Sequence, residues 1–475
     1  MSKIVFIEPK ASNLHIFSVY PLPRLGLLIL GTMMKQRGWD VELFIEELRK
    51  IDFEKIRGAG LVGISTITAT APRAYAIADK VREMGIPVIM GGPHVTYLAE
   101  EALAHADYVI RGEGERTLAA FIDAWESGTG FEEVPNLSYW KDKTMFHNPW
   151  RRQDDDLDSI PFPDFSLLKA DQTKKGGSTI IPVQTSRGCP FDCSFCSVTG
   201  MFGKKYRFRS TENIIAELRR YNSRKNTVFF YDDNFAANPR RAKELLKAMI
   251  RERFKFKWTT QVRADVTKDL ELVRLMKRAG CHTLFIGFES VNPSSLEAMK
   301  KKQTVDEIAR SIKILRKHRI HIHGMFVLGF DEDDWKTVQQ NVKFAKKAKL
   351  TSTQFLILTP LPGSEFYAKV AAENRIQFHD WTLYDAHHVV FRPARLSLFD
   401  LQKAQIFCHK KFYSLKQTVK KFFKGKWIDL GIAHYARKLN KTWRKRNKTF
   451  LRAIALLKPK KGAKITLDYK EDIIL

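Results

Sequence analysis

Cysteine is scarce in this chain, and its scarcity excludes one class of protein. Only five cysteines occur among the 475 residues, and no signal-peptide pattern stands at the start. Small secreted proteins that rely on disulfides carry far more cysteine for their length. We therefore expect a cytoplasmic chain whose thiols stay reduced.

Long apolar runs and acidic residues are also in short supply. No run reaches the roughly 18 apolar residues of a membrane span, so the sequence predicts no such span. Lys and Arg number 81 against 52 Asp and Glu, which gives a net charge of +29. Such an excess favours anionic partners: nucleic acid, lipid headgroups or phosphorylated substrates. The length allows two or three domains.

Three of the five cysteines stand close together. Residues 187–196 read RGCPFDCSFC, so Cys189, Cys193 and Cys196 have C-x3-C-x2-C spacing. Three thiolates can hold three irons of a [4Fe–4S] cluster and leave the fourth iron open to a ligand. A structural zinc site needs four ligands, and no second Cys-x2-Cys pair exists. The motif favours a cluster over zinc, whereas Cys281 and Cys408 are expected to be buried packing residues.

Residues 1–130 predict a doubly wound, Rossmann-like parallel sheet, because short apolar runs alternate with amphipathic helical patterns. The expected strands are Ile4–Ile7, Val41–Ile45, Leu61–Ser65, Pro87–Met90 and Tyr108–Ile110, and the expected helices are Leu25–Gln36, Ala71–Met84 and Glu115–Trp125. Ligands of such sheets bind beyond the carboxyl ends of the strands.

Glycines and polar residues follow three of these strands, at Ser65-Thr66, Gly91-Gly92-Pro93-His94 and Gly112-Glu113-Gly114-Glu115. Glycine lets a backbone approach a bulky ligand closely, but it also simply makes turns. The residues alone leave both interpretations open. The dinucleotide fingerprint G-x-G-x-x-G is absent after the first strand.

Residues 131–178 predict a linker, since Ile160-Pro161-Phe162-Pro163 breaks regular structure. Between residues 179 and 395 the alternation resumes. Its expected strands are Ile181–Thr185, Val228–Tyr231, Lys257–Val262, Thr283–Ile286, His321–Val327 and Thr353–Leu358. Six strand–helix units predict a partial (β/α)6 barrel of the TIM type, with its active site at the carboxyl ends of the strands. Residues at those ends favour a ligand site there: Asp232, Asp233, Arg263, Glu289 and Gly329.

The cysteine motif, with an aromatic residue before its last cysteine, resembles the radical S-adenosylmethionine enzymes. The Gly-Gly-Pro-His and Arg-Gly-Glu-Gly-Glu segments ahead of it resemble the cobalamin-binding domain of class B radical methylases. The resemblance covers residues 1–395 and implies three cofactors: a [4Fe–4S] cluster, S-adenosyl-L-methionine and cobalamin. The D-x-H-x-x-G motif, which supplies a histidine to cobalt in other cobalamin proteins, is missing.

The resemblance also implies roles for individual residues. Cys189, Cys193 and Cys196 would hold the cluster that generates the radical. Asp232 and Asp233 replace the Gly-Gly-Glu motif of the family and would face the amino group of S-adenosylmethionine. Arg263 would pair with its carboxylate, Glu289 with its ribose, and Gly329 would let the adenine approach. The cobalamin site would be lined by Ser65, Thr66, Gly91, Gly92, His94, Gly112 and Glu113.

The implied reaction is methylation of an unactivated carbon in a small molecule, with flavodoxin or ferredoxin as electron donor. A lipid or isoprenoid-like substrate is our first expectation. Radical cyclisation, ring rearrangement or C–C coupling is the alternative within the same class. The alternative from a different class of function is a protein that binds or modifies nucleic acid and uses the cluster as a structural or redox element.

Residues 396–475 predict a helical, basic region. Between Lys410 and Leu467 the only acidic residue is Asp429, and aromatic residues such as Phe423 and Trp427 are interleaved with Lys and Arg. This pattern suits the surface of a membrane with anionic lipids, and we expect peripheral contact with the inner membrane. A solvated helical cap and a nucleic-acid site are the alternatives.

Overall fold

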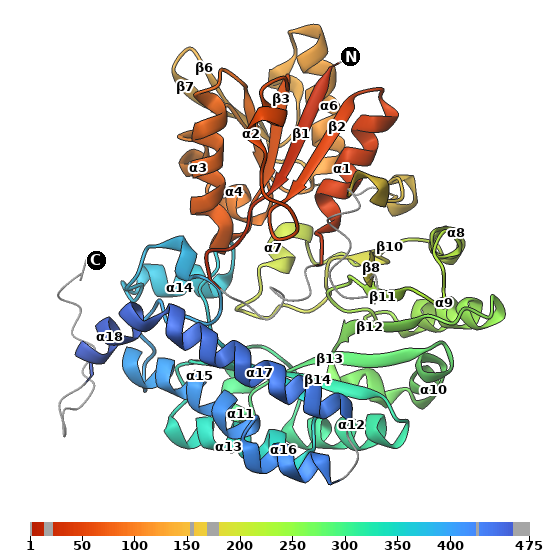
Figure 1. Ribbon diagram of the computed structural model, residues 1–475, viewed down its shortest axis with the longest axis vertical. Coiled ribbons are helices and arrows are strands. Elements are labelled where there is room, and N and C mark those ends of the chain that lie inside the picture. Colours follow the sequence, from red (N-terminus) through yellow and green to blue (C-terminus); the bar gives the residue numbers. More distant parts are fainter. Residues whose placement is uncertain (1, 14–21, 153–155, 169–179, 424–426, 459–475) are drawn as a thin grey trace. The chain divides into compact units, whose positions relative to one another are not determined.

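The computed structural model describes residues 2–13, 22–152, 156–168, 180–423 and 427–458 (Figure 1). The chain forms two compact units. The first unit comprises Met1–Ser12, Phe17–Gly188 and Ser197–Thr227, and the second comprises Asn13–Ile16, Cys189–Cys196 and Val228–Leu475. The domain boundaries expected at residues 130, 178 and 395 remain a proposal.

The first unit contains a seven-stranded sheet of order β2-β1-β3-β4-β5-β6-β7. Its parallel part consists of β1 (Lys3–Glu8), β2 (Asp40–Ile45), β3 (Leu61–Ser65), β4 (Val88–Gly91) and β5 (Tyr108–Ile110). The helices are α1 (Leu25–Gln36), α2 (Phe53–Ile56), α3 (Ala71–Arg82), α4 (Pro93–Tyr97), α5 (Ala99–Leu103), α6 (Gly114–Ser127), α7 (Val198–Phe202) and α8 (Thr211–Arg219).

Alternate side chains of β1 pack in two separate hydrophobic cores, one on each face of this sheet. Val5 and Ile7 pack in the core that includes Ile77 of α3. Ile4 and Phe6 pack in the core that includes Phe121 of α6. A strand that is apolar on both faces is what a doubly wound sheet requires, so that prediction is confirmed.

The region expected to be only a linker contributes a hairpin to the same sheet. β6 (Leu137–Lys141) and β7 (Thr144–His147) add to its edge as antiparallel strands. Their turn has positive φ at both Asp142 (47°) and Lys143 (64°), as a type I′ turn demands. Asn-Gly is the usual signal for such a turn, and Asp-Lys is not, which is why the sequence did not reveal the hairpin.

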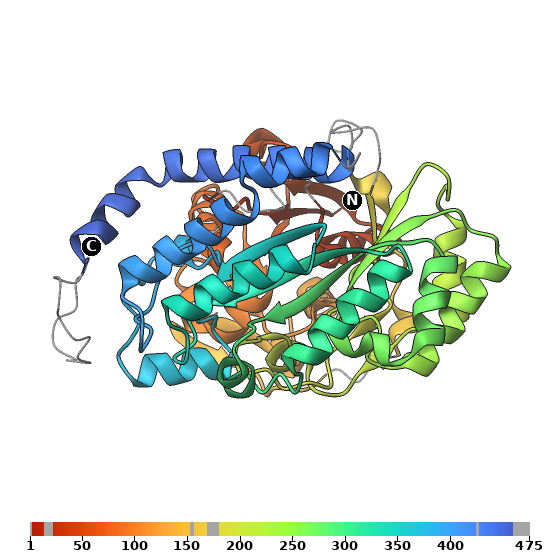
Figure 2. The same cartoon turned by 90° about the horizontal axis from the view of Figure 1, so that it is seen from below.

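A second sheet has six strands in the order β15-β14-β13-β12-β11-β8. They are β8 (Ile180–Val183), β11 (Thr227–Phe230), β12 (Lys257–Val262), β13 (Cys281–Glu289), β14 (His321–Leu328) and β15 (Ser352–Ile357), and the ladders from β12 to β15 are parallel. The helices among and after them are α9 (Pro239–Arg251), α10 (Leu270–Arg278), α11 (Pro293–Ala298), α12 (Val305–Lys317), α13 (Trp335–Lys347) and α14 (Glu365–Ala372). In Figure 2 the green and teal helices lie outside the strands that they follow.

This second sheet is strongly curved. The ring of Phe229, on β11, lies 6.1 Å from the ring of Phe285, on β13, although β12 runs between them. Strands two apart in a flat sheet are about 9.5 Å apart, so the two rings share one face and approach each other across β12, as side chains do on the inside of a curved sheet. The expected partial barrel is confirmed. Four more helices follow in the described part of the chain: α15 (Leu398–Phe412), α16 (Leu415–Phe422), α17 (Trp427–Arg446) and α18 (Lys448–Leu456). Within the described residues, no helix has both the length and the apolarity to cross a membrane.

Four buried charges stabilise the first unit. Arg187 lies on β9 (Ser186–Arg187) and Arg207 on the antiparallel β10 (Arg207–Phe208). Arg187 donates to Glu113 (2.6 Å) and to Glu115, and Arg207 also donates to Glu113. Burial raises the pKa of Glu115, but the charge of Arg187 outweighs it and holds that pKa below its usual value. The cluster ties the strand before the cysteine loop to the start of α6.

We predict that Glu113→Gln destabilises the protein, because it leaves two buried guanidinium groups short of one negative charge. Breaking a buried ion pair costs about 3–5 kcal/mol. Urea denaturation followed by circular dichroism at pH 7 measures the change. Glu54→Gln, which breaks only the exposed pair with Arg57, is the control and should leave the transition where it is. An equal response of the two variants would contradict the structural role of the cluster.

Candidate functional site

The cysteine loop, residues 188–196, is fixed at several points. Its backbone at Ser194 donates to the carbonyl of Met299 (3.4 Å) and accepts from the amide of Phe366 (2.9 Å). The ring of Phe195 lies edge-on to that of Phe330, with 5.9 Å between the centroids. This ring contact helps to hold the loop in place.

The side chain of Arg263 also contacts this loop. Its buried guanidinium stacks on the ring of Phe191, 3.8 Å from the centroid. It also donates to the carbonyl of Lys301 and faces the carboxylate of Asp265 (3.3 Å). One side chain therefore joins the end of β12 to the cysteine loop and to residue 301.

The three cysteines fit an iron–sulfur cluster. Cys189, Cys193 and Cys196 are partly exposed and none is in a disulfide. Burial raises the pKa of Cys189 and of Cys193, while Lys301 and Arg263 pull that of Cys193 down. Metal coordination deprotonates such thiols, and neighbouring cations favour that change. Within the described part of the chain, no three His, Cys, Asp or Glu side chains could hold a single metal ion together.

Lys301 is a site residue that sequence reasoning missed. It stands in the run Lys300-Lys301-Lys302, which is typical of a solvated surface, yet it is buried and pairs with buried Glu289 at 2.7 Å. Glu289 has a φ of 60°, and a side chain at Gly287 would stand only 2.2 Å from its carboxylate. The sequence feature that could have indicated this ion pair is Gly287-Phe288-Glu289 at the end of β13, because the glycine leaves room for the two charged side chains.

The remaining strand-end residues lie in the same unit. Asp232 is fully buried, whereas Asp233 is exposed to solvent although protein surrounds it on most sides. These surroundings, and the charge of Asp232 beside it, raise the pKa of Asp233 to about 7. The amide of Gly329 donates to buried Asp333 (2.9 Å) and so shapes the turn after β14. An accessible carboxylate with a raised pKa is typical of a site that receives a cation.

The three loops at the carboxyl edge of the first sheet are tied to one another. The backbone amide and hydroxyl of Thr66 both donate to the carbonyl of Gly91, at 2.8 and 3.1 Å. Gly92 has a φ of +104°, and a Cβ there would lie 2.3 Å from the carbonyl of Thr66. The amide of Gly112 donates to the hydroxyl of Thr96 (2.9 Å). The glycines thus allow the loops to approach each other.

Exposure divides the residues expected at the cobalamin site into two groups. Ser65, Gly91 and Gly92 are partly exposed, as an edge that receives a bulky cofactor requires. The buried ones support the loops from within: Thr66, His94, Gly112 and Glu113. His94 bonds through Nε2 to the hydroxyl of Tyr75 (3.1 Å), and Glu113 belongs to the ion cluster with Arg187 and Arg207. The edge therefore fits the cofactor, and the contacts of the individual residues with cobalamin stay a prediction.

Comparisons with known proteins agree with this geometry. The model of the radical SAM superfamily matches residues 183–345, and that of the B12 binding domain matches residues 17–122. An uncharacterised methyltransferase of Pyrococcus horikoshii is 32% identical over 404 residues, which are 82% of this chain and 88% of that protein. The chain belongs to the cobalamin-dependent radical SAM methyltransferase family. Its cofactors are a [4Fe–4S] cluster, S-adenosylmethionine and cobalamin, so the expected family and cofactors are confirmed.

Other relatives in this family carry specific names. The bacteriochlorophyllide d C-12(1)-methyltransferase of Chlorobaculum tepidum is 29% identical over 83% of both chains. The hopanoid C-2 methylase of Rhodopseudomonas palustris is 24% identical over 76% of this chain and 66% of its own. Among solved structures, the cobalamin-dependent S-adenosylmethionine radical enzyme OxsB, with aqua-cobalamin and S-adenosylmethionine bound, has a TM-score of 0.71 at 16% identity. That likeness covers 96% of this chain and 75% of OxsB, and it shows the shared fold.

We predict that Lys301→Gln slows alkylation of Cys193 by iodoacetamide in the cluster-free protein about three- to tenfold at pH 8. Removing the cation raises the thiol pKa by up to about one unit and so lowers the thiolate fraction. Peptide mass spectrometry after timed labelling measures the rate. Lys302→Gln removes the same charge from the exposed neighbour and should leave the rate unchanged. Equal rates in the wild type and in Lys301→Gln would show that Lys301 does not act on the thiol.

Proposed function

We propose that this enzyme methylates an unactivated carbon of a largely apolar small molecule. The observation that carries the proposal is the assembly, within one unit, of the cysteine loop, accessible Asp233 and the buried pair Lys301–Glu289. The bound cofactors supply a radical that removes hydrogen from carbon and a methyl group for transfer. Flavodoxin or ferredoxin is the proposed electron donor.

In this scheme the residues of the chain bind the cofactors and orient them. Cys189, Cys193 and Cys196 hold the cluster, and Arg263 positions their loop through Phe191. Asp233 receives the amino group of S-adenosylmethionine, while Glu289, oriented by Lys301, accepts from its ribose hydroxyls. Arg263 remains the candidate for the carboxylate of S-adenosylmethionine, although its present partners are Phe191, Asp265 and Lys301. In the first unit, Ser65, Gly91 and Gly92 contact cobalamin.

The concave face of the second sheet supports an apolar substrate. The rings of Phe229 and Phe285 are half-buried there, and the ring of His323 lies 4.7 Å from that of Phe285. Burial lowers the pKa of His323 to about 4, so this side chain is neutral near pH 7 and bonds to Ser352 (2.8 Å). An aromatic surface with one neutral polar group suits a lipid, an isoprenoid or a tetrapyrrole ring. The names of the hopanoid and bacteriochlorophyllide methylases agree with this class.

Cyclisation is the second candidate within this class. Anaerobic magnesium-protoporphyrin IX monomethyl ester cyclases are also relatives, at 25% identity over 87% of this chain for that of Cereibacter sphaeroides. A cyclisation leaves no new methyl group in its product. The fate of the methyl group therefore separates the two candidates.

The decisive experiment follows the methyl group. Reconstituted enzyme with cobalamin, a reductant and methyl-labelled S-adenosylmethionine is incubated anaerobically with lipid and tetrapyrrole extracts. We expect label in an apolar product together with 5′-deoxyadenosine. Replacing Cys189, Cys193 and Cys196 by Ala should remove the iron, both products and the brown colour, whereas Cys281→Ala with Cys408→Ala should keep them. Iron retained in the triple variant, or 5′-deoxyadenosine formed without label in any product, would contradict the proposal.

We predict that S-adenosylmethionine binds to the reconstituted protein about tenfold more tightly at pH 8 than at pH 6. With its pKa at about 7, Asp233 is roughly one-tenth ionised at pH 6 and nine-tenths ionised at pH 8, and only the carboxylate attracts the ammonium group. Isothermal titration calorimetry at the two pH values measures the affinities. Asp233→Asn should bind weakly with no pH dependence. A pH dependence that persists in this variant would assign the effect to another group.

A further inference from the structure

Large apolar side chains with high exposure are concentrated in one stretch of the chain. Among the described residues twelve such side chains are exposed, and the seven between residues 67 and 270 are at most 47% exposed. The other five range from 52% to 86% and all lie between residues 415 and 456: Leu415, Val419, Phe423, Trp427 and Leu456. Exposed apolar surface gathered in this way is typical of a docking site.

Three of these side chains form a row along α16. Leu415, Val419 and Phe423 are four residues apart, which places them on one side of the helix. The other side packs on α17, where Arg437 donates to the carbonyl of Tyr413 (3.3 Å) and to the hydroxyl of Thr418. Thr418 therefore faces α17, whereas Leu415, Val419 and Phe423 are exposed.

A second row runs along α17 and α18, and it is basic. Exposed residues recur at intervals of three or four along both helices, which is the repeat of one helix face. This face runs through Trp427, Gly431, His434, Lys438, Lys441, Lys445, Lys448, Arg452 and Leu456. It has an apolar residue at each end and five cations from Lys438 to Arg452.

Contacts on the inner side fix the orientation of this face. Trp443 and Ile454 are buried. The ring of His388 lies 4.9 Å from that of Trp443 and 4.7 Å from that of Phe450. Its Nε2 bonds to Asn447 (3.0 Å), between the two helices, while its Nδ1 bonds to buried Asp385 (2.9 Å). Because these contacts prevent the helices from rotating, the basic row stays in contact with solvent.

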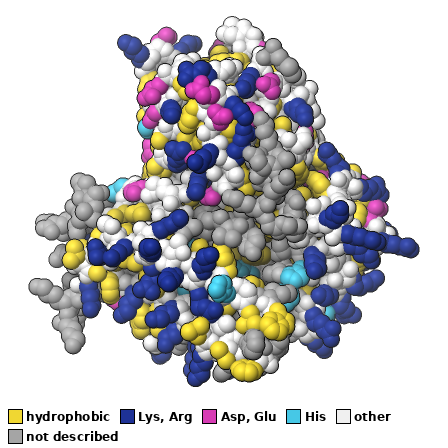
Figure 3. Space-filling view, in the orientation of Figure 1, with side chains coloured by type: hydrophobic (Ala, Val, Ile, Leu, Met, Phe, Trp, Pro, Cys, Tyr) yellow, Lys and Arg dark blue, Asp and Glu magenta, His cyan; other side chains and the backbone are white. Residues whose placement is uncertain are grey.

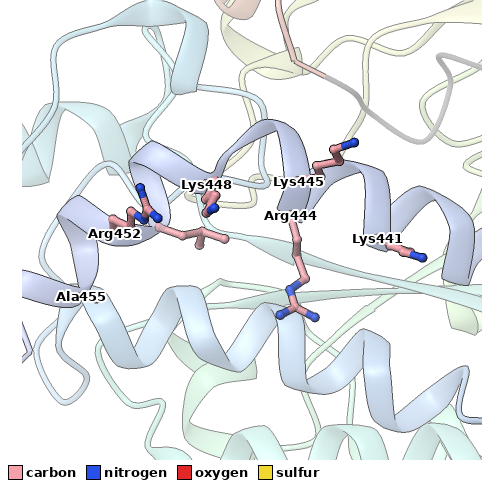
Figure 4. Close-up of a pocket in the computed structure, with 7 residues that line it drawn as sticks. Lys441, Arg444, Lys445, Lys448, Arg452 and Ala455 are labelled. Carbon is pink, nitrogen blue, oxygen red and sulfur yellow. The ribbon is translucent and has the colours of Figure 1, made fainter.

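Charge of one sign covers this surface. Sixteen Lys and Arg occur from Lys410 to Lys458, against the single acidic residue Asp429, which is buried. In Figure 3 dark blue and yellow side chains predominate over the region of α16–α18, with very little magenta. An open hollow of about 530 Å³ lies along α17 and α18 (Figure 4). Its lining consists of Lys441, Arg444, Lys445, Lys448, Leu451, Arg452 and Ala455.

We propose that α16–α18 form a docking face for the surface of an anionic phospholipid membrane. The hollow accepts phosphate headgroups between its cations, and the exposed side chains of α16 and Trp427 insert at the level of the acyl chains. Aromatic and aliphatic side chains beside Lys and Arg are what an interfacial helix presents to lipid. A phosphate groove for RNA would need the cations but has no use for the aliphatic row of Leu415 and Val419. The inference is independent of the proposed reaction, since the face uses none of the residues assigned to cofactors or substrate.

Vesicle flotation with the full-length chain tests the docking face. The vesicles contain phosphatidylcholine with 30% phosphatidylglycerol, and pure phosphatidylcholine serves as the neutral surface. We expect binding to the anionic vesicles that weakens steeply between 50 and 500 mM salt. Lys441→Gln with Lys445→Gln and Lys448→Gln should reduce the affinity roughly a hundredfold, at about fivefold for each cation. Phe423→Ser with Trp427→Ser should reduce it at least about tenfold while leaving the net charge unchanged.

Two controls make the outcome specific. Arg310→Gln with Lys313→Gln and Lys317→Gln removes three exposed cations from α12 over an equal length of helix, and this variant should bind like the wild type. Vesicles with brominated acyl chains should quench tryptophan fluorescence in the wild type and less so in Trp427→Phe. Absence of vesicle binding at 50 mM salt would overturn the proposal, and so would equal losses in the α12 and α17–α18 variants. A single-stranded RNA that binds tightly, without any effect of the Phe423 and Trp427 substitutions, would assign the face to nucleic acid instead.

Discussion

The buried guanidinium of Arg263 is the contact on which the site of the second unit depends. It stacks on Phe191 of the cysteine loop, donates to the carbonyl of Lys301 and faces Asp265. Since Lys301 in turn pairs with Glu289, one cation at the end of β12 links the loop to the end of β13. A planar side chain with five donors can serve all these partners at once, which the point charge of a lysine could not. Arg263 thus holds in place the loop that presents the three thiols.

The distribution of charge separates the parts that hold the fold from those that await a ligand. Glu113, Glu115, Arg187 and Arg207 neutralise one another inside the first unit and hold its fold. Asp233 differs, because its surroundings and the charge of Asp232 raise its pKa to about 7. The outer face of α17 and α18 differs in the opposite sense, since its cations have no acidic residue among them except buried Asp429. Uncompensated charge near a surface is costly for the free protein, and a ligand of opposite sign removes that cost.

Regular elements were largely predictable because their patterns are local. Leu25–Gln36, Leu61–Ser65, Tyr108–Ile110 and Lys257–Val262 were expected with the bounds that the structure has, since apolar runs and apolar periodicity mark them directly. The hairpin of β6 and β7 was not predicted, because its turn has Asp142-Lys143 in place of Asn-Gly. The burial of Lys301 was not predicted, because a lysine between two lysines is typical of an exposed surface. Its burial depends on the contact with Glu289 at the end of β13, which only the folded chain brings about.

The sequence by itself determined the chemistry of this protein. The spacing of Cys189, Cys193 and Cys196, and the glycine-rich turns after the N-terminal strands, carry the resemblance that implied the family and its three cofactors, and such motifs are local properties of the chain. Tertiary structure alone decided which residues are available to those cofactors. It drew His94 and Glu113 into internal contacts, left Asp233 accessible, buried Lys301 beside Glu289 and turned the basic row of α17 and α18 outwards. Burial and the pairing of charges depend on residues far apart in the sequence, so no local pattern encodes them.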